Sequence, residues 1–493
     1  MFRLMEDVVK ALAKEVLSSA DIEWNPPPGL LRRESSRYAG FTKTGSLAVV
    51  SSKARARRPD RTRVKYLRDE GFDRLVVDAW DYVVKASFYA VERCVGSGDR
   101  RFRILALVEK SYPHLALMSH LNFFPCGSTG SYDMVTIDVP SYSDVWMLVE
   151  RRSNSTLVLG SDYYGELKMS FLRLAMNEAR DRHLGVGLHA ASKLYRVRVE
   201  GSMREVGVLV FGLSGTGKTT LTVEDHGLRE PEYVRVMQDD IVILDWRGVA
   251  HGTEMNLYPK TDSVPELKKL EPAVLHPDAV LENVVVKSDG TPDFTDLSLT
   301  RNARALAIRE AIPIASGSVD LMGTNVLVFL TRRPEMPPLA RLTSPYQAVA
   351  YFMLGESFRT SAEAGKPEPV RVPGFDPFML EPKWRSAYSL LDLIKSLNMN
   401  VYVMNTGHAK DRKIPPELSK HLLLSLVKEN VDWKLDKHMG FEIAVRAGGV
   451  NLDGYNPEEL YGESYVRVVD LLRRDRQEFL RSIPSVSFLA DYV

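Results

Sequence analysis

The chain has 493 residues, more than one ordinary hydrophobic core organises, so its length predicts two domains or one two-lobed enzyme. Lysine and arginine total 65 and aspartate and glutamate total 64, and this balance gives no reason to expect a nucleic-acid or membrane partner. The only cysteines are Cys94 and Cys126, which argues against a disulfide scaffold and against a four-cysteine metal site.

The start of the chain lacks the long apolar core of a secretory signal peptide. No apolar run is long enough to span a bilayer, so we expect a cytoplasmic protein. Glutamine occurs only at Gln238, Gln347 and Gln477, whereas arginine is abundant. Scarcity of this thermolabile amide is typical of a thermophilic source, although lineage bias produces the same pattern.

The first part of the chain combines helical and strand patterns. Residues 1–24 carry apolar Val8, Leu12 and Val16 at helical spacing, and the proline-rich stretch 25–29 ends this expected helix. A helix over 171–182 is expected to join this part to the next. Residues 1–187 are therefore predicted to form a mixed α/β N-terminal lobe, with strands at 46–52, 74–78, 103–108, 134–139 and 156–159.

Residues 188–493 are expected to form the C-terminal lobe, and the chain becomes rich in strand patterns from about Leu188. Apolar and β-branched runs predict strands at 194–200, 206–211, 234–238, 241–245, 280–287, 326–330 and 399–404. Helical spacing predicts helices at 344–363, 383–396, 416–427 and 457–482.

One stretch of this second lobe carries the strongest functional signal. The apolar run 208–211 predicts a buried strand that leads into the glycine-rich turn 212–217 and then into Lys218, Thr219 and Thr220. This is the G-x-x-x-x-G-K-[ST] phosphate loop in its strand-then-helix context. Backbone N–H groups of such a turn surround phosphate oxygens, and the helix start adds a positive dipole end. Lys218 would contact the β- and γ-phosphates and Thr219 a magnesium ion. The alternative is a glycine-rich turn that binds nothing.

An acidic pair follows the predicted strand 234–238. A phosphate loop works with a downstream acidic residue at a strand end, which orders the water shell of the metal. Asp239 and Asp240 fit this role, because two adjacent carboxylates are not buried without partners. A surface turn is the alternative.

Other candidates are not ranked by the residue pattern. Positive groups are needed to neutralise the transferring phosphoryl group, and Lys260, Arg304 and Arg341 are available for this role. His189 lies in an apolar stretch, so residue type alone indicates a core histidine rather than a ligand.

The loop Gly212-Leu-Ser-Gly-Thr-Gly-Lys-Thr-Thr-Leu221 resembles the signature of the ATP-type phosphoenolpyruvate carboxykinases. The resemblance is convincing from about residue 160 to 430. It is thin before that, where Ala56-Arg-Arg-Pro59 looks like the family's substrate-arginine segment. Other stretches match in the family's order, namely Tyr163-Tyr-Gly-Glu-Leu-Lys168, His189, the pair 239–240, Glu254, Tyr258-Pro-Lys-Thr261, 281–284, Asn302-Ala-Arg304, 329–331, 337–343 and 403–407.

The resemblance implies a two-lobed α/β fold with the phosphate loop and ATP on the C-terminal lobe and the substrate on the side of the N-terminal lobe. The family decarboxylates oxaloacetate and transfers the γ-phosphoryl group of ATP to the enolate oxygen. The products are phosphoenolpyruvate, carbon dioxide and ADP. The expected partners are therefore ATP and a small metabolite, and the oligomeric state stays open.

Roles carried over from the family follow position by position. Lys218 and Arg304 would bind and stabilise the γ-phosphoryl group, and Thr219 would coordinate Mg²⁺. His189 and Asp240 would hold a second divalent metal, usually Mn²⁺. The substrate would contact Arg57, Tyr163 and Ser214. Nucleotide contacts would come from Gly212, Leu213, Ser214, Gly215, Thr216, Gly217, Lys218, Thr219, Thr220 and Arg304. Either Lys413 or Arg412, together with Ile414, would flank the adenine.

The chain departs from the family at the corner where the substrate would react. The family's lysine that ligates manganese is replaced by Met169, whose thioether is a poor ligand for a hard divalent ion. One family glycine is Tyr164, which narrows the pocket. Lys168 or His183 would have to take over the missing role.

The departure leaves three functional hypotheses. The first is an ATP-dependent phosphoenolpyruvate carboxykinase, and the second is a kinase of the same fold that phosphorylates a hydroxyl of another small molecule. In the second case Asp239 or Asp240 would act as base. A catalytically silent nucleotide-binding regulator is the third, and the retained Lys218 and Thr219 argue against it.

Overall fold

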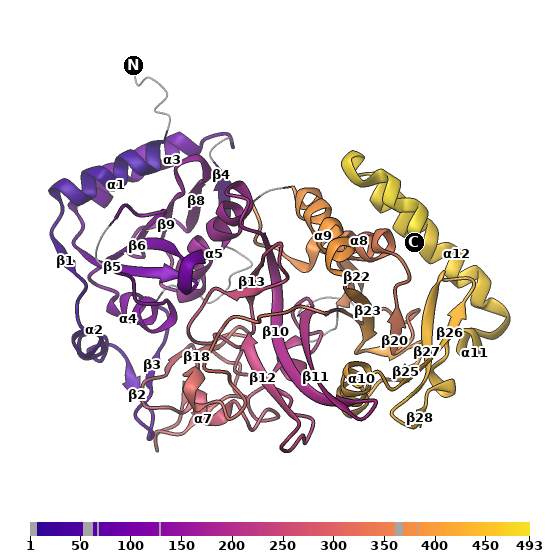
Figure 1. Cartoon of the computed structure of the whole chain (residues 1–493). Helices are drawn as coiled ribbons and strands as arrows, with labels where there is room; N and C mark the ends of the chain where they lie inside the picture. The colour runs from indigo at the N-terminus through magenta and orange to yellow at the C-terminus, as the bar shows by residue number, and fades with distance from the viewer. Residues whose placement is uncertain (1–6, 53–62, 67–68, 128–129, 360–367, 381) are drawn as a thin grey trace. The chain divides into compact units, whose positions relative to one another are not determined.

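The computed structural model describes residues 7–52, 63–66, 69–127, 130–359, 368–380 and 382–493 (Figure 1). The chain forms two compact units, each built from two stretches: Met1–Glu178 with Thr253–Ala315, and Ala179–Gly252 with Ser316–Val493. The lobes expected at 1–187 and 188–493 are continuous, so they differ from these units mainly in the placement of Thr253–Ala315. This return depends on pairing between distant strands, which local sequence patterns do not reveal.

The first unit is organised around a seven-stranded mixed sheet with the strand order β1-β5-β6-β7-β9-β8-β4. Strands β6, β7 and β9 run parallel, whereas β5 and β8 are antiparallel to their neighbours β6 and β9. The strands are β1 (Ile22–Trp24), β4 (Arg63–Tyr66), β5 (Phe88–Val95), β6 (Phe102–Glu109), β7 (Met134–Val139), β8 (Trp146–Glu150) and β9 (Ser155–Leu159).

Two helices pack together against the apolar core of this sheet, α1 (Val8–Ser19) and α3 (Phe72–Lys85) (Figure 1). The strand predicted at 74–78 is wrong, because these residues lie inside α3. Phe72, Val76 and Val83 are buried at helical spacing, and this longer period outweighs the short alternation that suggested a strand.

Two further helices carry residues that matter below. Helix α4 (Pro113–Asn122) packs against β5 and β6. Helix α5 (Tyr164–Asp181) begins seven residues before the helix predicted at 171–182, so Lys168 and Met169 lie in its second turn. The unit is completed by α2 (Pro28–Ser35), α7 (Glu271–Val274), the pair β16 (Val285–Val286) and β17 (Pro292–Asp293), and the sheet of β18 (Arg304–Leu306), β15 (Val280–Glu282), β3 (Leu47–Val49) and β2 (Gly40–Phe41).

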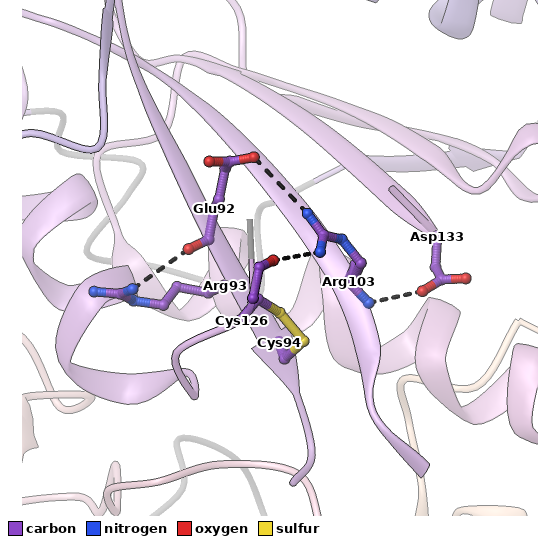
Figure 2. Close-up of a disulfide and its surroundings, with 7 residues drawn as sticks. Glu92, Arg93, Cys94, Arg103, Cys126 and Asp133 are labelled. Atoms are coloured by element: carbon purple, nitrogen blue, oxygen red, sulfur yellow. Dashed lines mark hydrogen bonds and ion pairs between the residues drawn. A yellow bond between two sulfur atoms is a disulfide. The ribbon is translucent and has the colours of Figure 1, made fainter. Parts of the chain in front are cut away.

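Cys94 and Cys126 form a disulfide in the first unit, with their Cα atoms 5.5 Å apart (Figure 2). It joins β5 to the segment that follows α4. The cysteine count argues against a disulfide scaffold, and the structure adds this single bond to a unit that already has a large apolar core. Pairing of two cysteines 32 positions apart is not a sequence signal, because it depends on how β5 and α4 fold together.

The second unit contains an eleven-stranded sheet, counted over the described residues, with the main order β14-β13-β10-β11-β19-β23-β20-β27-β26. Strands β11, β19 and β23 run parallel, so their carboxyl ends meet at one edge. The strands are β10 (Val186–Val199), β11 (Ser202–Phe211), β12 (Tyr233–Gln238), β13 (Ile241–Leu244), β14 (Ala250–Gly252), β19 (Val326–Thr331), β20 (Leu339–Arg341), β23 (Asn400–Asn405), β26 (Val431–Asp436), β27 (Phe441–Ala447) and β28 (Val450–Asn451).

The helices of the second unit include α6 (Lys218–Val223), α8 (Pro345–Leu354), α9 (Lys383–Leu397), α10 (Pro416–Val427), α11 (Pro457–Tyr461) and α12 (Tyr465–Arg481). Two predicted helices are shorter than expected. The helix predicted at 344–363 ends at Leu354, because Gly355 adopts a left-handed conformation and β21 (Glu356–Arg359) follows, paired with β22 (Glu368–Arg371). The helix predicted at 457–482 is interrupted at Gly462, which also has a positive φ. None of the helices described in either unit has the length and apolar composition needed to cross a bilayer.

Candidate active site

The glycine-rich turn 212–217 lies in the second unit between the carboxyl end of β11 and helix α6. Gly215 and Gly217 have φ angles of +77° and +86°, which L residues other than glycine adopt at a cost. At Gly212 a Cβ would lie 2.4 Å from the Thr216 hydroxyl, so a side chain does not fit there. The local fold therefore needs glycine at each of these three positions.

The turn is attached to the neighbouring parallel strand. The Thr406 hydroxyl, just beyond β23, donates to the Thr216 carbonyl at 2.7 Å. The buried Thr216 hydroxyl donates back to the Leu213 carbonyl at 2.7 Å. These bonds hold the turn at the edge where the parallel strands end, which is where α/β sheets place their ligands.

Lys218, His189 and Asp240 come together beside this turn. The Lys218 ammonium lies 2.9 Å from His189 Nε2 and 3.8 Å from Asp240 Oδ1. His189 Nε2 and Asp240 Oδ1 are 3.1 Å apart. The three side chains are 10–26% exposed, so solvent and ligands reach them.

Strand pairing explains how His189 and Asp240 meet. His189 is on β10, which pairs with both β12 and β13. Asp240 lies in the turn between β12 and β13, and His189 is opposite Ile241 in the register. The apolar stretch around His189 indicated a core histidine. The side chain is nearly buried, but its outer nitrogen faces a lysine and a carboxylate.

The other ring nitrogen of His189 is fixed by the backbone. His189 Nδ1 lies 2.6 Å from the Phe375 carbonyl oxygen, which can only accept, so Nδ1 carries the proton and donates. Nε2 is then an acceptor when the ring is neutral. His189 Nε2 and Asp240 Oδ1 are then two acceptor atoms only 3.1 Å apart, and a cation is needed to offset their repulsion. The Lys218 ammonium, beside both atoms, is that cation in this structure.

This arrangement fits a divalent metal, since a histidine whose second nitrogen is held by a carbonyl is the common form of metal-ligating histidine. No group of three or more His, Cys, Asp or Glu side chains in the described ranges is placed to hold a metal. His189 and Asp240 therefore offer two ligands, and water or phosphate oxygens would have to complete the shell, as is usual for Mg²⁺ in nucleotide sites.

The predicted adenine residues follow β23 on the hairpin of β24 (His408–Ala409) and β25 (Arg412–Lys413). The Arg412 guanidinium donates to the Gly454 carbonyl at 2.7 Å and stacks on Tyr455. Lys413 is exposed, whereas Ile414 is buried and donates its N–H to Gly407. Because Thr406 and Gly407 connect β23 to this hairpin, the hairpin and the glycine-rich turn are joined through one short segment.

The first unit holds the predicted site residues Tyr163, Lys260 and Arg304, whereas Ser214, Thr219 and Asp239 belong to the second unit. The Tyr163 hydroxyl accepts from the Asn302 amide at 2.9 Å, and Arg304 Nε donates to the Asn302 carbonyl oxygen at 3.2 Å. Asn302 therefore links Tyr163 to Arg304, and burial raises the pKa of Tyr163. Lys260 pairs with Arg304 through backbone atoms. The predicted substrate residue Arg57 lies outside the described residues.

Tyr258 lies at the centre of a corner of the first unit that is formed with Tyr163, Tyr164, Lys168 and Arg304. The Lys168 ammonium and the Arg304 guanidinium each lie 5.7 Å from the centroid of its ring, within range for a cation–π interaction. Arg304 also donates to the Tyr258 carbonyl at 3.2 Å. The fully buried Tyr164 ring meets Tyr258 edge-on.

Lys168 is held by a carboxylate. Its ammonium lies 3.0 and 3.1 Å from the two oxygens of Glu254, and both side chains are less than 5% exposed. The Asn122 amide donates to the same carboxylate at 2.7 Å. Met169, beside it on α5, is buried, and His183 is exposed. The charge of Lys168 is thus balanced inside the protein.

Glu282 is a residue to which the sequence assigned no role. It is fully buried on β15, accepts the hydrogen bond of the Tyr258 hydroxyl and accepts from the Tyr164 N–H at 2.8 Å. Burial raises the pKa of Glu282 to about 7, against the lowering effects of these two hydrogen bonds. Its place in the matched motif 281–284 was the only signal for it, as was that of Asn302 in its own motif.

Arg341, the third cation candidate, is engaged elsewhere. Its guanidinium pairs with Glu442 and stacks on Trp433 at 4.9 Å, on the far strands of the second unit's sheet.

A glycine-rich turn between a parallel strand and a short helix, with a lysine, a histidine and an aspartate beside it, is typical of α/β proteins that bind phosphate groups. The family model of the ATP-type phosphoenolpyruvate carboxykinases matches residues 20–453. The chain belongs to the phosphoenolpyruvate carboxykinase family, which confirms the resemblance seen in its motifs.

Curated relatives agree with this assignment. The chain is 27% identical to the ATP-type phosphoenolpyruvate carboxykinase of Mesorhizobium japonicum over 80% of this chain and 75% of that protein. It is 27% identical to the Thermus thermophilus enzyme over 83% and 81% of the two chains. The glycosomal enzyme of Trypanosoma cruzi is 26% identical over 81% and 88%.

Proposed function

We propose that the protein is an ATP-dependent phosphoenolpyruvate carboxykinase that converts oxaloacetate and ATP into phosphoenolpyruvate, carbon dioxide and ADP. The observation that carries the proposal is the meeting of Lys218, His189 and Asp240 beside a glycine-rich turn in a chain of this family. Loss of carbon dioxide leaves an electron pair on the enolate, whose oxygen then takes the γ-phosphoryl group of ATP.

In this proposal the turn 212–217 surrounds the phosphates with backbone N–H groups and Lys218 neutralises the γ-phosphoryl group. Thr219 would face Mg²⁺, and His189 with Asp240 would hold a second divalent ion, for which Mn²⁺ is the family's usual choice. Bound there, the ions would neutralise phosphate and enolate charge. Arg412, Lys413 and Ile414 would lie at the adenine.

The substrate side is proposed from the corner of the first unit. Arg304, oriented by Asn302 and Tyr258, would stabilise the transferring group, and Tyr163 would contact the substrate. Arg57 and Ser214 would complete the substrate contacts. Because Met169 removes one cation, the ammonium of Lys168 is the remaining positive group on this turn of α5.

The direct test is to incubate the protein with oxaloacetate, ATP, Mg²⁺ and Mn²⁺ and to measure phosphoenolpyruvate. Lys218→Ala should slow formation of the product by about a hundred- to a thousandfold, while Lys434→Ala, at an exposed lysine of the same unit, should leave it unchanged. Absence of product from wild-type protein that binds ATP would overturn the carboxykinase assignment.

A second function has one observation in its favour. Lys168 is already neutralised by Glu254 and Met169 is a thioether, so the corner is poorer in positive charge than an enolate requires. A kinase of the same fold that phosphorylates a hydroxyl would not need that charge, and Asp239 or Asp240 would then serve as base. ADP release with serine, threonine, sugars or polyols, and none with oxaloacetate, would favour this function.

A further inference from the structure

The Cys94–Cys126 disulfide lies beside the segment that carries Glu254. Cys94 exchanges two backbone hydrogen bonds with Phe124, at 2.8 and 3.0 Å. The disulfide, shown in Figure 2, and these two backbone bonds fasten the chain after α4 to the end of β5. Around the sulfur atoms, the Arg103 guanidinium bonds the Gly127 carbonyl and lies 4.0 Å from Glu92. The disulfide therefore joins two segments, the end of β5 and the chain that follows α4.

Both segments form hydrogen bonds with residues 253–256, the stretch that contains Glu254. On the β5 side, the Gly96 N–H donates to the Thr253 carbonyl at 3.0 Å. On the α4 side, the Asn122 carbonyl accepts from the Met255 N–H at 2.8 Å. Asn256 donates its side-chain amide to the Leu121 carbonyl at 2.6 Å. Residues 253–256 are thus fixed from both sides, two residues from Cys94 on one side and four to five from Cys126 on the other.

The same segments aim the Glu254 carboxylate. The Asn122 amide bonds one carboxylate oxygen at 2.7 Å, and the Lys168 ammonium lies 3.0 and 3.1 Å from the two oxygens. Asn122 and Glu254 are at most 1% exposed, so no water competes for these bonds. A shift of the end of α4 would therefore move Glu254 and, with it, the ammonium group of Lys168.

We propose that the Cys94–Cys126 disulfide is a positioning clamp that holds Glu254 on Lys168, so that opening it by a dithiol lowers catalysis at this corner. The catalytic part rests on the proposed function. Glu254, Asn122 and the two cysteines act through Lys168 and are positioning residues.

The opening step is a two-electron exchange. Cys94 is fully buried and Cys126 is partly exposed, so a dithiol thiolate attacks the Cys126 sulfur and forms a mixed disulfide with it, releasing Cys94 as a thiol. The second thiolate of the dithiol then displaces Cys126. The reductant leaves as a cyclic disulfide, and its two protons end on Cys94 and Cys126.

The kinetic test compares oxidised wild type, wild type reduced with dithiothreitol and the double variant Cys94→Ser/Cys126→Ser, all well below their unfolding temperatures. We expect the reduced and the double-variant proteins to lose about tenfold in kcat/KM for oxaloacetate, with ATP affinity unchanged within about twofold. Dithiothreitol should not change the double variant, which controls for effects of the reagent on metals.

A clamp that acts through Glu254 makes a further prediction that a merely structural bond does not. Oxidised Glu254→Gln should lose a similar factor, and its reduction should add less than twofold, because the two changes remove the same interaction. If the losses in kcat/KM caused by Glu254→Gln and by reduction multiply, the proposal is overturned. It is also overturned if reduction lowers the unfolding temperature but leaves kcat/KM unchanged.

Hydrogen exchange separates this inference from the proposed function. The amide of Met255 should exchange about tenfold faster after reduction, measured by mass spectrometry on a peptide that covers 253–256. Faster exchange in a protein that makes no phosphoenolpyruvate in either form would overturn the proposed function and support the clamp. Equal exchange in the two forms would overturn the clamp.

Discussion

The two candidate regions handle charge in opposite ways. Beside the glycine-rich turn, Lys218, His189 and Asp240 are partly exposed and leave two acceptor atoms facing each other. In the corner of the first unit, Lys168 and Glu254 are fully buried and neutralise each other. The first arrangement is suited to receiving charged ligands, whereas the second already satisfies its charges within the protein. Loss of a charge from the buried Lys168–Glu254 pair should therefore lower stability as well as catalysis, whereas loss of Lys218 should lower activity with little effect on stability.

The largest effect on stability is expected when Lys168 is removed from its buried pair with Glu254. Lys168→Met leaves the Glu254 carboxylate buried without its cation, and we expect a loss of 3–5 kcal/mol in the free energy of unfolding. The double variant Lys168→Met/Glu254→Gln should recover part of it. Urea unfolding of the single and double variants measures both values, and equal losses would contradict the view that the pair is compensated.

Removing the lysine beside the turn should act on ligands instead. We expect Lys218→Ala to lower kcat/KM by about a hundred- to a thousandfold, the effect of losing one preorganised stabilising group. Its free energy of unfolding should change by less than about 1 kcal/mol, because the side chain is partly exposed. Steady-state kinetics and urea unfolding on the same preparation measure the two values. A large loss of stability with unchanged kcat/KM would contradict the role given to Lys218.

Glu282 makes the stability of the first unit depend on pH. Its folded pKa of about 7 lies above its ordinary value of 4.5, so the folded state holds a proton that the unfolded state has lost between those pH values. The resulting stabilisation is fully present below pH 4.5 and is lost as the pH rises through 7, a fall of about 3 kcal/mol. Glu282→Gln should lack this fall in urea unfolding from pH 5 to 8, and the exposed control Glu266→Gln should keep it. Parallel curves for wild type and Glu282→Gln would contradict the assignment.

The smallest effects concern one glycine from each region. At Gly165 an added Cβ would lie 2.3 Å from the buried Tyr163 ring, so Gly165→Ala should cost about 2 kcal/mol. Gly217→Ala meets no atom within 4 Å but keeps a φ of +86°, and should cost about 1 kcal/mol. Thermal unfolding with Gly29→Ala as control, where a helix gains a better residue without strain, measures the difference.

Local patterns predicted the part of the molecule that local sequence builds. The strand 208–211, the turn and Lys218 follow from one contiguous motif, and the family resemblance followed from several motifs in order. The strand predicted at 74–78 failed because Val76 and its neighbours fit a short alternation as well as the longer period of α3. Asn122, Glu254 and the disulfide bring together residues far apart in the chain, and no local signal reports such pairing.

The return of Thr253–Ala315 to the first unit has a consequence for how the chain is made. Strand β15, which pairs with β3, is synthesised more than 200 residues later, after Ala179–Gly252 of the second unit has already emerged. Ribosomal synthesis therefore cannot complete one unit before starting the other, unlike a chain whose domains follow in series. For the same reason, a fragment that stops at residue 187 would lack Glu254, Tyr258, Glu282 and Arg304, and either unit can be produced alone only as two pieces or as a rejoined chain.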